Sequence, residues 1–148
     1  MERVIIKNKK AMFDYEIGFT VVAGLVLKGS EVKGIKASKV SIGEAFITVS
    51  PSGKQLILKG ANITIPEYAV QEKVNPTRDR VLLVSKAQRD RLKKGVEREG
   101  YTIVPIAITI ADNGLVKIHI ALAKGRKTYD KREVLKKRDI ERNEKLKF

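Results

Sequence analysis

The run VPIAITIADNGLVKIHIALAKG at residues 104–125 places the strongest constraint on the fold. In its second half Val116, Ile118 and Ile120 alternate with Lys117 and His119. This period of two is typical of a strand with one buried face and one wet face. The ADNG tetrapeptide in the middle supplies residues that tolerate a positive φ. The run therefore predicts two long strands joined by a tight turn.

Three further segments have strand character. The valine-rich run FTVVAGLVLKG at residues 19–29 predicts a buried strand that ends at a lysine and a glycine. Residues 44–65, EAFITVSPSGKQLILKGANITI, carry two β-rich stretches around SPSGK and predict a hairpin. Residues 80–84 predict another strand.

The clearest helix signal lies at residues 86–99. Ser85, followed three residues later by Gln88, matches a capping box, and Gly100 stands where a left-handed cap ends a helix. A second, short helix is predicted within GSEVKGIKASKV at residues 29–40, with Ser30 as its cap and Glu31 in its first turn.

Many short antiparallel strands with an inserted helix favour an OB-like antiparallel β-barrel of about six strands, in a mainly β chain with flanking helices. We expect this barrel to occupy residues 1–130. Residues 131–148 mix both charge signs and have no continuous apolar stripe. They are predicted to form a flexible basic C-terminal tail that is disordered when free.

Charge points to a polyanionic partner. Among 148 residues, 31 are Lys or Arg against 17 Asp or Glu, which gives a formal charge of +14. Such a field attracts nucleic acid or anionic lipid. The longest apolar runs are far shorter than a membrane span of about 20 residues, so we expect no membrane partner. The absence of cysteine excludes disulfides and thiolate zinc sites and favours a cytoplasmic protein.

Catalytic chemistry finds little support. His119 is the one histidine, and its position on the face of Lys117 predicts a surface side chain. No second histidine or cysteine is available for a metal site or a nucleophile dyad. Nor is there a phosphate-cradling glycine loop. We therefore expect no enzyme activity, no metal and no cofactor.

Binding chemistry is better supported. Lys and Arg residues gather in four places: residues 7–10, 78–89, 91–94 and 124–132. These cations can neutralise phosphates, and Tyr15 and Tyr129 beside them can stack on unpaired bases, whereas Phe13 is expected in the core. A general single-stranded RNA-binding OB protein or a ribosomal protein remains the alternative. It predicts several aromatic side chains on one face, but only 5% of the residues are aromatic.

Four strings of the sequence resemble one known family over nearly the full chain. They are NKKAMFDYEI at 8–17, AGLVLKGSEVKGIKASKVSI at 23–42, NPTRDRVLL at 75–83 and VPIAITIADNGLVKIHIALAKGRKTYDKRE at 104–133. Together with the basic tail they resemble the small protein B family, the SsrA-binding (tmRNA-binding) proteins of bacterial trans-translation. The string ANITIPEY departs from that family, because Asn62 replaces a histidine and Glu67 separates Pro66 from Tyr68.

The resemblance implies an OB-like barrel that binds the tRNA-like domain of tmRNA and delivers it to stalled ribosomes. The tail would enter the empty mRNA path of the small subunit and become helical there. The family is not enzymatic, and the protein is expected to be a monomer when free.

The resemblance also implies roles for individual residues. RNA binding is carried over to Asn8, Lys9, Lys10, Tyr15, Glu31, Lys33, Lys124, Arg126 and Lys127. Ribosome binding is carried over to Tyr129, Asp130, Lys131, Arg132, Lys136, Lys137 and Arg138. Because a carboxylate repels phosphate, Glu31 is expected to organise the surface. On that basis Glu31→Gln would weaken RNA binding and leave the melting temperature nearly unchanged.

Overall fold

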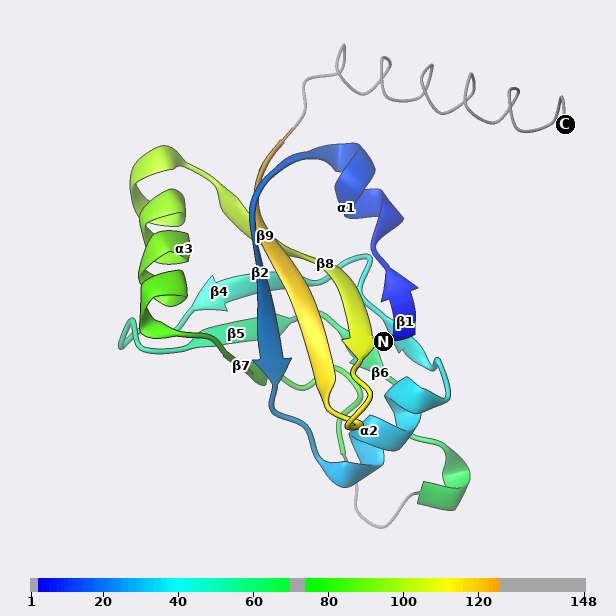
Figure 1. Ribbon diagram of the computed structural model, residues 1–148. Helices are drawn as coiled ribbons and strands as arrows, with labels where there is room; N and C mark the ends of the chain where they lie inside the picture. Colours follow the sequence, from blue (N-terminus) through cyan, green and yellow to red (C-terminus); the bar gives the residue numbers. More distant parts are fainter. Residues whose placement is uncertain (1–2, 70–73, 126–148) are drawn as a thin grey trace, which may run out of the picture.

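The computed structural model describes residues 3–69 and 74–125, and its elements are drawn in Figure 1. Their order is β1 (Arg3–Lys7), α1 (Lys9–Asp14), β2 (Tyr15–Leu25), α2 (Gly29–Lys36), β3 (Val40–Ser41), β4 (Phe46–Val49), β5 (Leu56–Lys59), β6 (Asn62–Ile63), a 3-10 turn (Glu67–Ala69), β7 (Arg80–Leu83), α3 (Lys86–Glu99), β8 (Thr102–Ile110) and β9 (Val116–Gly125). The predicted tail and the five residues before it lie outside the described residues.

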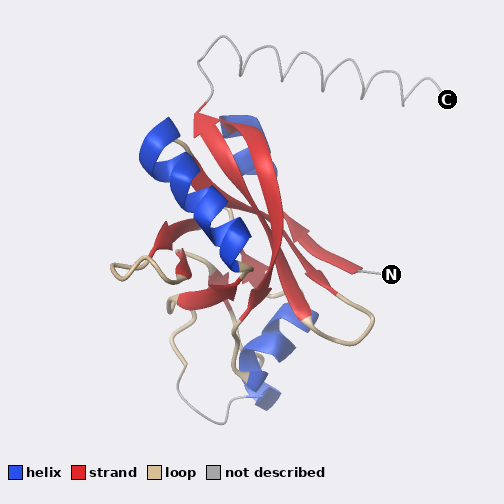
Figure 2. Ribbon diagram, turned by 60° about the vertical axis from the view of Figure 1, so that its left-hand side comes forward, coloured by secondary structure: helices blue, strands red, loops and turns tan. Residues whose placement is uncertain are grey.

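The strands pair in a closed circuit. The main sheet has the order β1-β8-β4-β5-β7-β2-β9, and β8 pairs with β9 as well. Six strands are therefore hydrogen-bonded in a ring, and β1 is added to the outside of β8. Within the ring, β4 and β8 share the fewest paired residues: Ile47 of β4 pairs with Ile103 of β8. A separate small sheet joins β3 and β6. The prediction of a mainly β chain with a few helices is confirmed (Figure 2).

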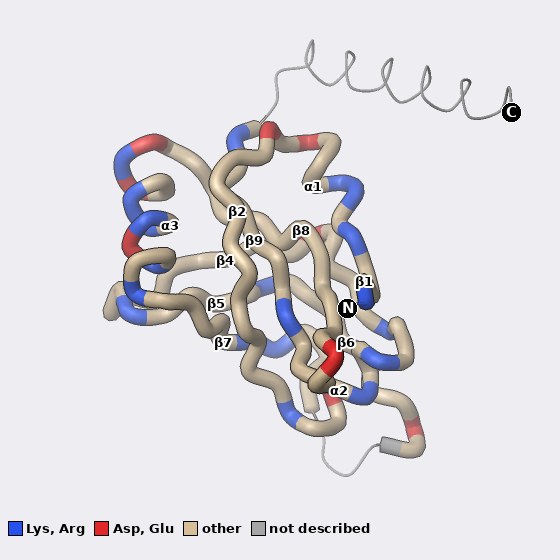
Figure 3. Tube along the Cα trace, viewed as in Figure 1, with Lys and Arg blue, Asp and Glu red and all other residues tan. Residues whose placement is uncertain are grey.

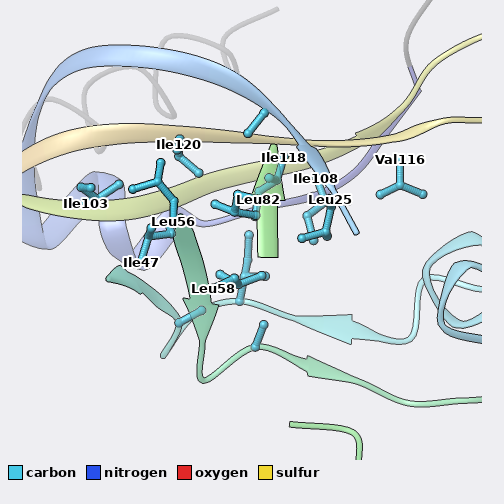
Figure 4. Close-up of a cluster of buried hydrophobic side chains, with 14 of the residues drawn as sticks. Leu25, Ile47, Leu56, Leu58, Leu82, Ile103, Ile108, Val116, Ile118 and Ile120 are labelled. Atoms are coloured by element: carbon cyan, nitrogen blue, oxygen red, sulfur yellow. The ribbon is translucent and has the colours of Figure 1, made fainter. Parts of the chain in front are cut away.

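The core fills the space between the strands of the ring. Figure 4 shows Leu56, Leu58 and Leu82 from one part of the ring pointing toward Ile118 and Ile120 of β9. All of these side chains are at most 3% exposed. The alternation that predicted β9 is confirmed, because its branched aliphatic residues point into this core. Burial of that apolar surface is the main favourable term in the folding of such a ring.

His119 is less exposed than the sequence suggested. Its side chain is half-buried, and its Nε2 lies 3.3 Å from the hydroxyl of Thr109. Thr109 belongs to β8, which runs beside β9, and is itself 3% exposed. The prediction of a surface histidine was wrong in this respect because the alternation of one strand does not reveal what its neighbour places beside it.

A second, smaller cluster lies under α1. Ala11 of this helix packs against Val104 of β8 and Ala123 of β9, with Tyr15 and Ile17 partly buried at its edge. α1 was not predicted, since a helix of six residues is too short to show a helical period. The helix covers one end of the β2–β9–β8 surface (Figure 1).

The long helix was predicted correctly. α3 spans Lys86–Glu99, as expected, and the Ser85 hydroxyl accepts a hydrogen bond from the Gln88 backbone N–H at 3.2 Å. The Gln88 side chain accepts from the Ser85 N–H at 3.2 Å in return. Gly100 ends the helix at φ 73°. Both predicted hairpins, β4–β5 and β8–β9, are also confirmed.

The start of the short helix differs from the prediction. α2 begins at Gly29, and its cap position is Lys28 rather than Ser30. Glu31 is then the third helical residue, and its carboxylate accepts a hydrogen bond from the Lys28 N–H at 2.9 Å. The carboxylate thus supplies half of a capping arrangement from inside the helix. Within residues 3–69 and 74–125, none of the three α-helices is long and apolar enough to cross a membrane.

Gly34 lets α2 lie directly on the small sheet. A Cβ at this position would lie 2.5 Å from the backbone oxygen of Thr64 and 3.1 Å from the Cγ2 of Ile63. A glycine in a helix interior is unfavourable by about 1 kcal/mol relative to alanine. Here close contact between helix and backbone explains why the residue is glycine.

We expect Gly34→Ala to lower the free energy of unfolding. The gain in helix propensity is about 1 kcal/mol, whereas forcing a methyl group into a packed backbone contact costs about 1–3 kcal/mol or more. Gly29→Ala is the matched control, because a Cβ at the first residue of the same helix meets nothing within 4 Å. Urea unfolding of both variants checks this. Equal or higher stability of Gly34→Ala would contradict the close packing.

Candidate nucleic-acid interface

Asn8 lies inside the molecule instead of on its RNA-binding surface. Its side chain is 3% exposed. The Nδ2 group donates to the carbonyls of Ile42 at 3.1 Å and Pro105 at 2.8 Å, and Oδ1 accepts from the Ala11 N–H at 3.1 Å. All polar atoms of the amide are therefore used to fasten the start of α1 to distant segments. A direct RNA contact by Asn8 is excluded in this conformation, and its contribution to a site is to position α1.

The two lysines that follow Asn8 are exposed. Lys9 and Lys10 occupy the first turn of α1 (Figure 3). The Lys10 ammonium forms an ion pair with the Glu44 carboxylate, whose side chain is 82% exposed. The hydrogen bond that Lys10 donates to the Glu44 carboxylate raises the pKa of Lys10 above its usual value. Lys10 is thus paired with the carboxylate of Glu44. Lys9 lies in the same exposed turn.

A cavity of about 340 Å³ opens beside α1. Its walls come from α1, from the turn before β4, and from the first residues of β2 and β8. Tyr15 and Phe46 contribute aromatic rings to it; Tyr15 is half-buried and Phe46 is 45% exposed. The complete lining consists of Asn8, Lys10, Ala11, Asp14, Tyr15, Gly43, Glu44, Ala45, Phe46, Thr102 and Val104.

Lys124 belongs to the same end of the molecule. It is exposed near the end of β9, and its ammonium lies 5.9 Å from the centre of the Tyr101 ring. In the sheet Lys124 pairs with Glu16, and the neighbouring Gly125 pairs with Tyr15. The fold therefore brings Lys124 to the end of the molecule that carries Lys9 and Tyr15, although it is distant from both in sequence.

Glu31 is placed elsewhere, at the opposite end of the molecule in α2 (Figure 1). Its side chain is 0% exposed, and its carboxylate binds two guanidinium groups. Arg80 donates to it from Nε at 2.9 Å and from Nη2 at 2.7 Å, and Arg78 donates from Nε at 3.1 Å and also from Nη2. Glu31 can therefore organise a surface from within, and it cannot itself touch RNA in this conformation.

Arg80 completes this buried cluster. It is 0% exposed, and beyond Glu31 it donates to the carbonyls of Ala61 at 3.0 Å and Pro76 at 2.9 Å. Four segments are joined in this way: α2, the end of the β5–β6 connection, the segment before β7, and β7 itself. The sequence had grouped Arg80 with the basic clusters available to a polyanion. That grouping was wrong for Arg80, because its charge is used inside the protein.

The arginines also set the ionisation of Glu31. Burial by itself would raise the pKa of the carboxyl group. Hydrogen bonds from Arg78, from the Lys28 N–H and from Arg80 act in the opposite direction and prevail, so the pKa of Glu31 lies below its usual range. The group is ionised in the folded protein at neutral pH.

The remaining predicted residues fall into two groups. Lys33 is exposed on α2, at the same end of the molecule as Glu31 and away from Lys9, Tyr15 and Lys124. Two RNA-binding predictions, Arg126 and Lys127, lie outside the described residues. All of the ribosome-binding predictions do so as well, namely Tyr129, Asp130, Lys131, Arg132, Lys136, Lys137 and Arg138.

Sequence reasoning missed an exposed aliphatic patch on β2 and β7. Val22 is 45% exposed and Leu83 is 60% exposed. Leu83 pairs with Gly24 and fills the space above it, with its Cβ 3.3 Å from where a Cβ of Gly24 would lie. In β9 the residues paired with Val22 and Gly24 are His119 and Lys117. The signal was available, because both aliphatic residues occupy outward positions of the strand alternation.

A metal centre finds no support in the geometry. Within the two described stretches, no group of three or more His, Asp or Glu side chains is arranged so that it could hold a metal ion. Polar chemistry in this part of the molecule consists of exposed cations, exposed aromatic rings and buried ion pairs. This combination suits binding of a polyanion with unpaired bases.

Comparison with known proteins identifies a family. The model of the SmpB protein family matches residues 5–148. SsrA-binding proteins of Beijerinckia indica and Azorhizobium caulinodans are 44% and 43% identical to the chain. The matches cover 93% and 95% of this chain and 86% and 87% of the relatives.

A solved structure is also similar. One chain of "tmRNA-SmpB: a journey to the center of the bacterial ribosome" superposes with a TM-score of 0.68 at 37% identity. The match covers 83% of the present chain and 85% of the other.

The buried cluster changes what we expect for Glu31→Gln. Removing one charge of a buried ion pair leaves the other uncompensated and lowers the free energy of unfolding by about 3–5 kcal/mol. This expectation replaces the nearly unchanged melting temperature inferred from the sequence. Glu44→Gln is the matched control, since it removes the same charge from an exposed pair and should leave the melting temperature almost unchanged. Thermal unfolding followed by circular dichroism measures both. Equal melting temperatures would show that the cluster does not stabilise the fold.

The lowered pKa of Glu31 predicts a pH dependence with a definite sign. A carboxyl group with a depressed folded-state pKa stabilises the protein fully above its unfolded pKa of about 4.3. That stabilisation is lost as pH falls through the folded-state pKa. The stability difference between wild type and Glu31→Gln should therefore be largest near neutral pH and shrink below about pH 4. Denaturant unfolding at stepwise lower pH tests this, and a constant difference would contradict it.

Proposed function

We propose, because the chain belongs to the SmpB protein family, that it binds the tRNA-like domain of tmRNA and delivers it to stalled ribosomes. Its relatives are named SsrA-binding proteins, and the similar solved structure describes tmRNA and SmpB in the bacterial ribosome. In this role the protein acts by binding and not by catalysis. The tail would probe the empty mRNA path of the small subunit.

The structural observation behind this proposal is that cations and an aromatic ring are grouped at one end of the molecule. Lys9, Lys10, Tyr15 and Lys124 meet there, and the chain continues from Gly125 into the basic sequence GRKTYDKR. Cations at this end neutralise backbone phosphates, and Tyr15 supplies a face for an unpaired base. Arg126 and Lys127 would extend the same surface.

The buried residues have positioning roles in this proposal. Asn8 fixes α1 and with it Lys9 and Lys10. Glu31 fixes α2 and with it the exposed Lys33. An effect of either buried residue on RNA affinity would then arise through the surfaces that they hold in place.

The ring of six strands is the part that we assign to the OB-like barrel at residues 1–130. Closure of the strand pairing and the insertion of α3 between β7 and β8 support this assignment. Residues 131–148 are assigned to a tail that is disordered when free and helical on the ribosome. Tyr129 and Asp130 just before the tail are assigned to ribosome contact, together with Lys131, Arg132, Lys136, Lys137 and Arg138 within it. We further propose that the protein is cytoplasmic and monomeric when free.

A general single-stranded RNA-binding protein remains the second candidate. Such proteins stack successive bases on aromatic side chains arranged along one groove. In the part of the chain that the structure describes, the exposed aromatic rings of Phe19, Phe46 and Tyr68 lie on β2, on β4 and in the 3-10 turn. Phe19 is covered by the Arg91 guanidinium at 5.2 Å from its centre. This scattered arrangement favours recognition of a folded RNA.

Titration against three RNAs tests the proposal. We expect the tRNA-like domain of tmRNA to bind far more tightly than an ordinary tRNA or poly-U at near-physiological salt. Lys124→Gln should weaken binding and reduce the slope of log affinity against log salt by about one, as expected for one lost phosphate contact. Lys54→Gln, at an exposed position between β4 and β5 and outside the four basic clusters, is the charge-matched control. If all three RNAs bind alike and binding collapses with salt, the general RNA-binding function takes the place of this one.

A further inference from the structure

The cavity beside α1 has the build of a small-ligand site. Its volume of about 340 Å³ lies at the lower end of the range for ligand pockets in proteins. Three small buried side chains line it, since Ala11, Ala45 and Val104 are 4%, 7% and 3% exposed. Tyr15 and Phe46 add aromatic surface that is still partly exposed. A flat, unsaturated ring fits between aromatic sides and against these small side chains.

Charged groups of both signs meet at the same cavity. Lys10 of α1 and Glu44 of the turn before β4 both line it and are paired with each other, so the ion pair links two of its walls. A lysine ammonium has three N–H donors, and a carboxylate has about four acceptor positions, so each keeps capacity for a ligand after the pair has formed. The cavity therefore offers donors and acceptors side by side next to an apolar interior.

We propose that this cavity binds a single unpaired guanine base of RNA, a step beyond the proposed function on which the inference rests. Tyr15 and Phe46 contact the faces of the base, and the Lys10–Glu44 pair reads its Watson–Crick edge. Lys10 donates to the O6 of guanine, and Glu44 accepts from its N1–H and N2–H groups. The base must be unpaired, because in a base pair the Watson–Crick edge of guanine is occupied by cytosine.

The preference for guanine follows from the order of donors and acceptors. Guanine presents one acceptor followed by two donors along this edge, which satisfies one ammonium and both oxygens of a carboxylate. Adenine, cytosine and uracil each present a single donor group there, and so leave one carboxylate oxygen without a partner from the base. The other bases therefore form fewer hydrogen bonds with the ion pair than guanine does, and are expected to bind less tightly.

Short RNAs test the inference without the tRNA-like domain. Full-length protein labelled with nitrogen-15 is titrated with UUGUU, UUAUU, UUCUU and UUUUU, and amide shifts are followed by NMR. We expect UUGUU to bind about tenfold more tightly than UUUUU, the order expected for a well-matched polar pair at a base edge. Shifts should concentrate at residues 8–15, 43–46 and 102–104. Equal affinities, or shifts spread over the basic surfaces, would overturn the inference.

Substitutions separate hydrogen bonding to the Watson–Crick edge of the base from the effect of net charge on RNA affinity. Glu44→Gln should lower the ratio of UUGUU to UUUUU affinity toward one. Glu97→Gln on exposed α3 raises the net charge by the same amount, so it should tighten all four RNAs alike and keep the ratio. Phe46→Leu should weaken all four. A ratio that survives in Glu44→Gln contradicts the assigned role of the ion pair.

The outcome is distinguishable from that of the proposed function. Specific binding of the tRNA-like domain without any base preference in short RNAs would leave the function standing and reject the guanine cavity. A guanine preference in short RNAs without selectivity for the tRNA-like domain would support the cavity and reject the function.

Discussion

A buried carboxylate between two guanidinium groups organises the end of this molecule that carries α2. Glu31 is removed from water together with Arg80, and the large desolvation penalty of such a pair is offset only when nearly all hydrogen-bonding positions are used. Here that condition is met, because Arg80 also donates to two backbone carbonyls. The arrangement ties α2 and the small sheet to the strand β7 of the ring. Without it α2 would keep the packing of Ile35 in the core but lose its polar link to β7.

Asn8 does the same work at the other end with a neutral group. Its amide joins α1 to the carbonyls of Ile42 and Pro105, which lie 34 and 97 residues away along the chain. Both ends of the molecule thus depend on one internal polar side chain whose partners come from remote segments. The exposed cations Lys9 and Lys33, for which we propose contact with RNA, lie on the short helices that these side chains hold in place.

The contrast between what the sequence predicted and what it missed has a physical origin. β9 and α3 were read correctly because their signals are local: the alternation around Ile118 and the caps at Ser85 and Gly100 depend on near neighbours in sequence. Asn8 was assigned to RNA binding through the family resemblance, and Arg80 was grouped with a basic cluster. Neither route reveals burial, because burial requires partners that only the folded chain supplies. The closing contact of β4 with β8 and the cavity beside α1 are likewise products of long-range pairing.

Internal polar groups and exposed cations therefore affect RNA binding by different routes. Lys124 or Lys9 acts on the bound state, and its loss changes the affinity of every folded molecule. Glu31 or Asn8 acts first on the fraction of molecules with an ordered helix, and the apparent dissociation constant rises as the inverse of that fraction. The two routes respond differently to temperature and salt. Cooling restores a marginally folded site, whereas only lower salt compensates for a lost phosphate contact. A weakened variant at Glu31 that recovers on cooling would thus reveal a residue of the fold, and one that does not recover would reveal a residue of the interface.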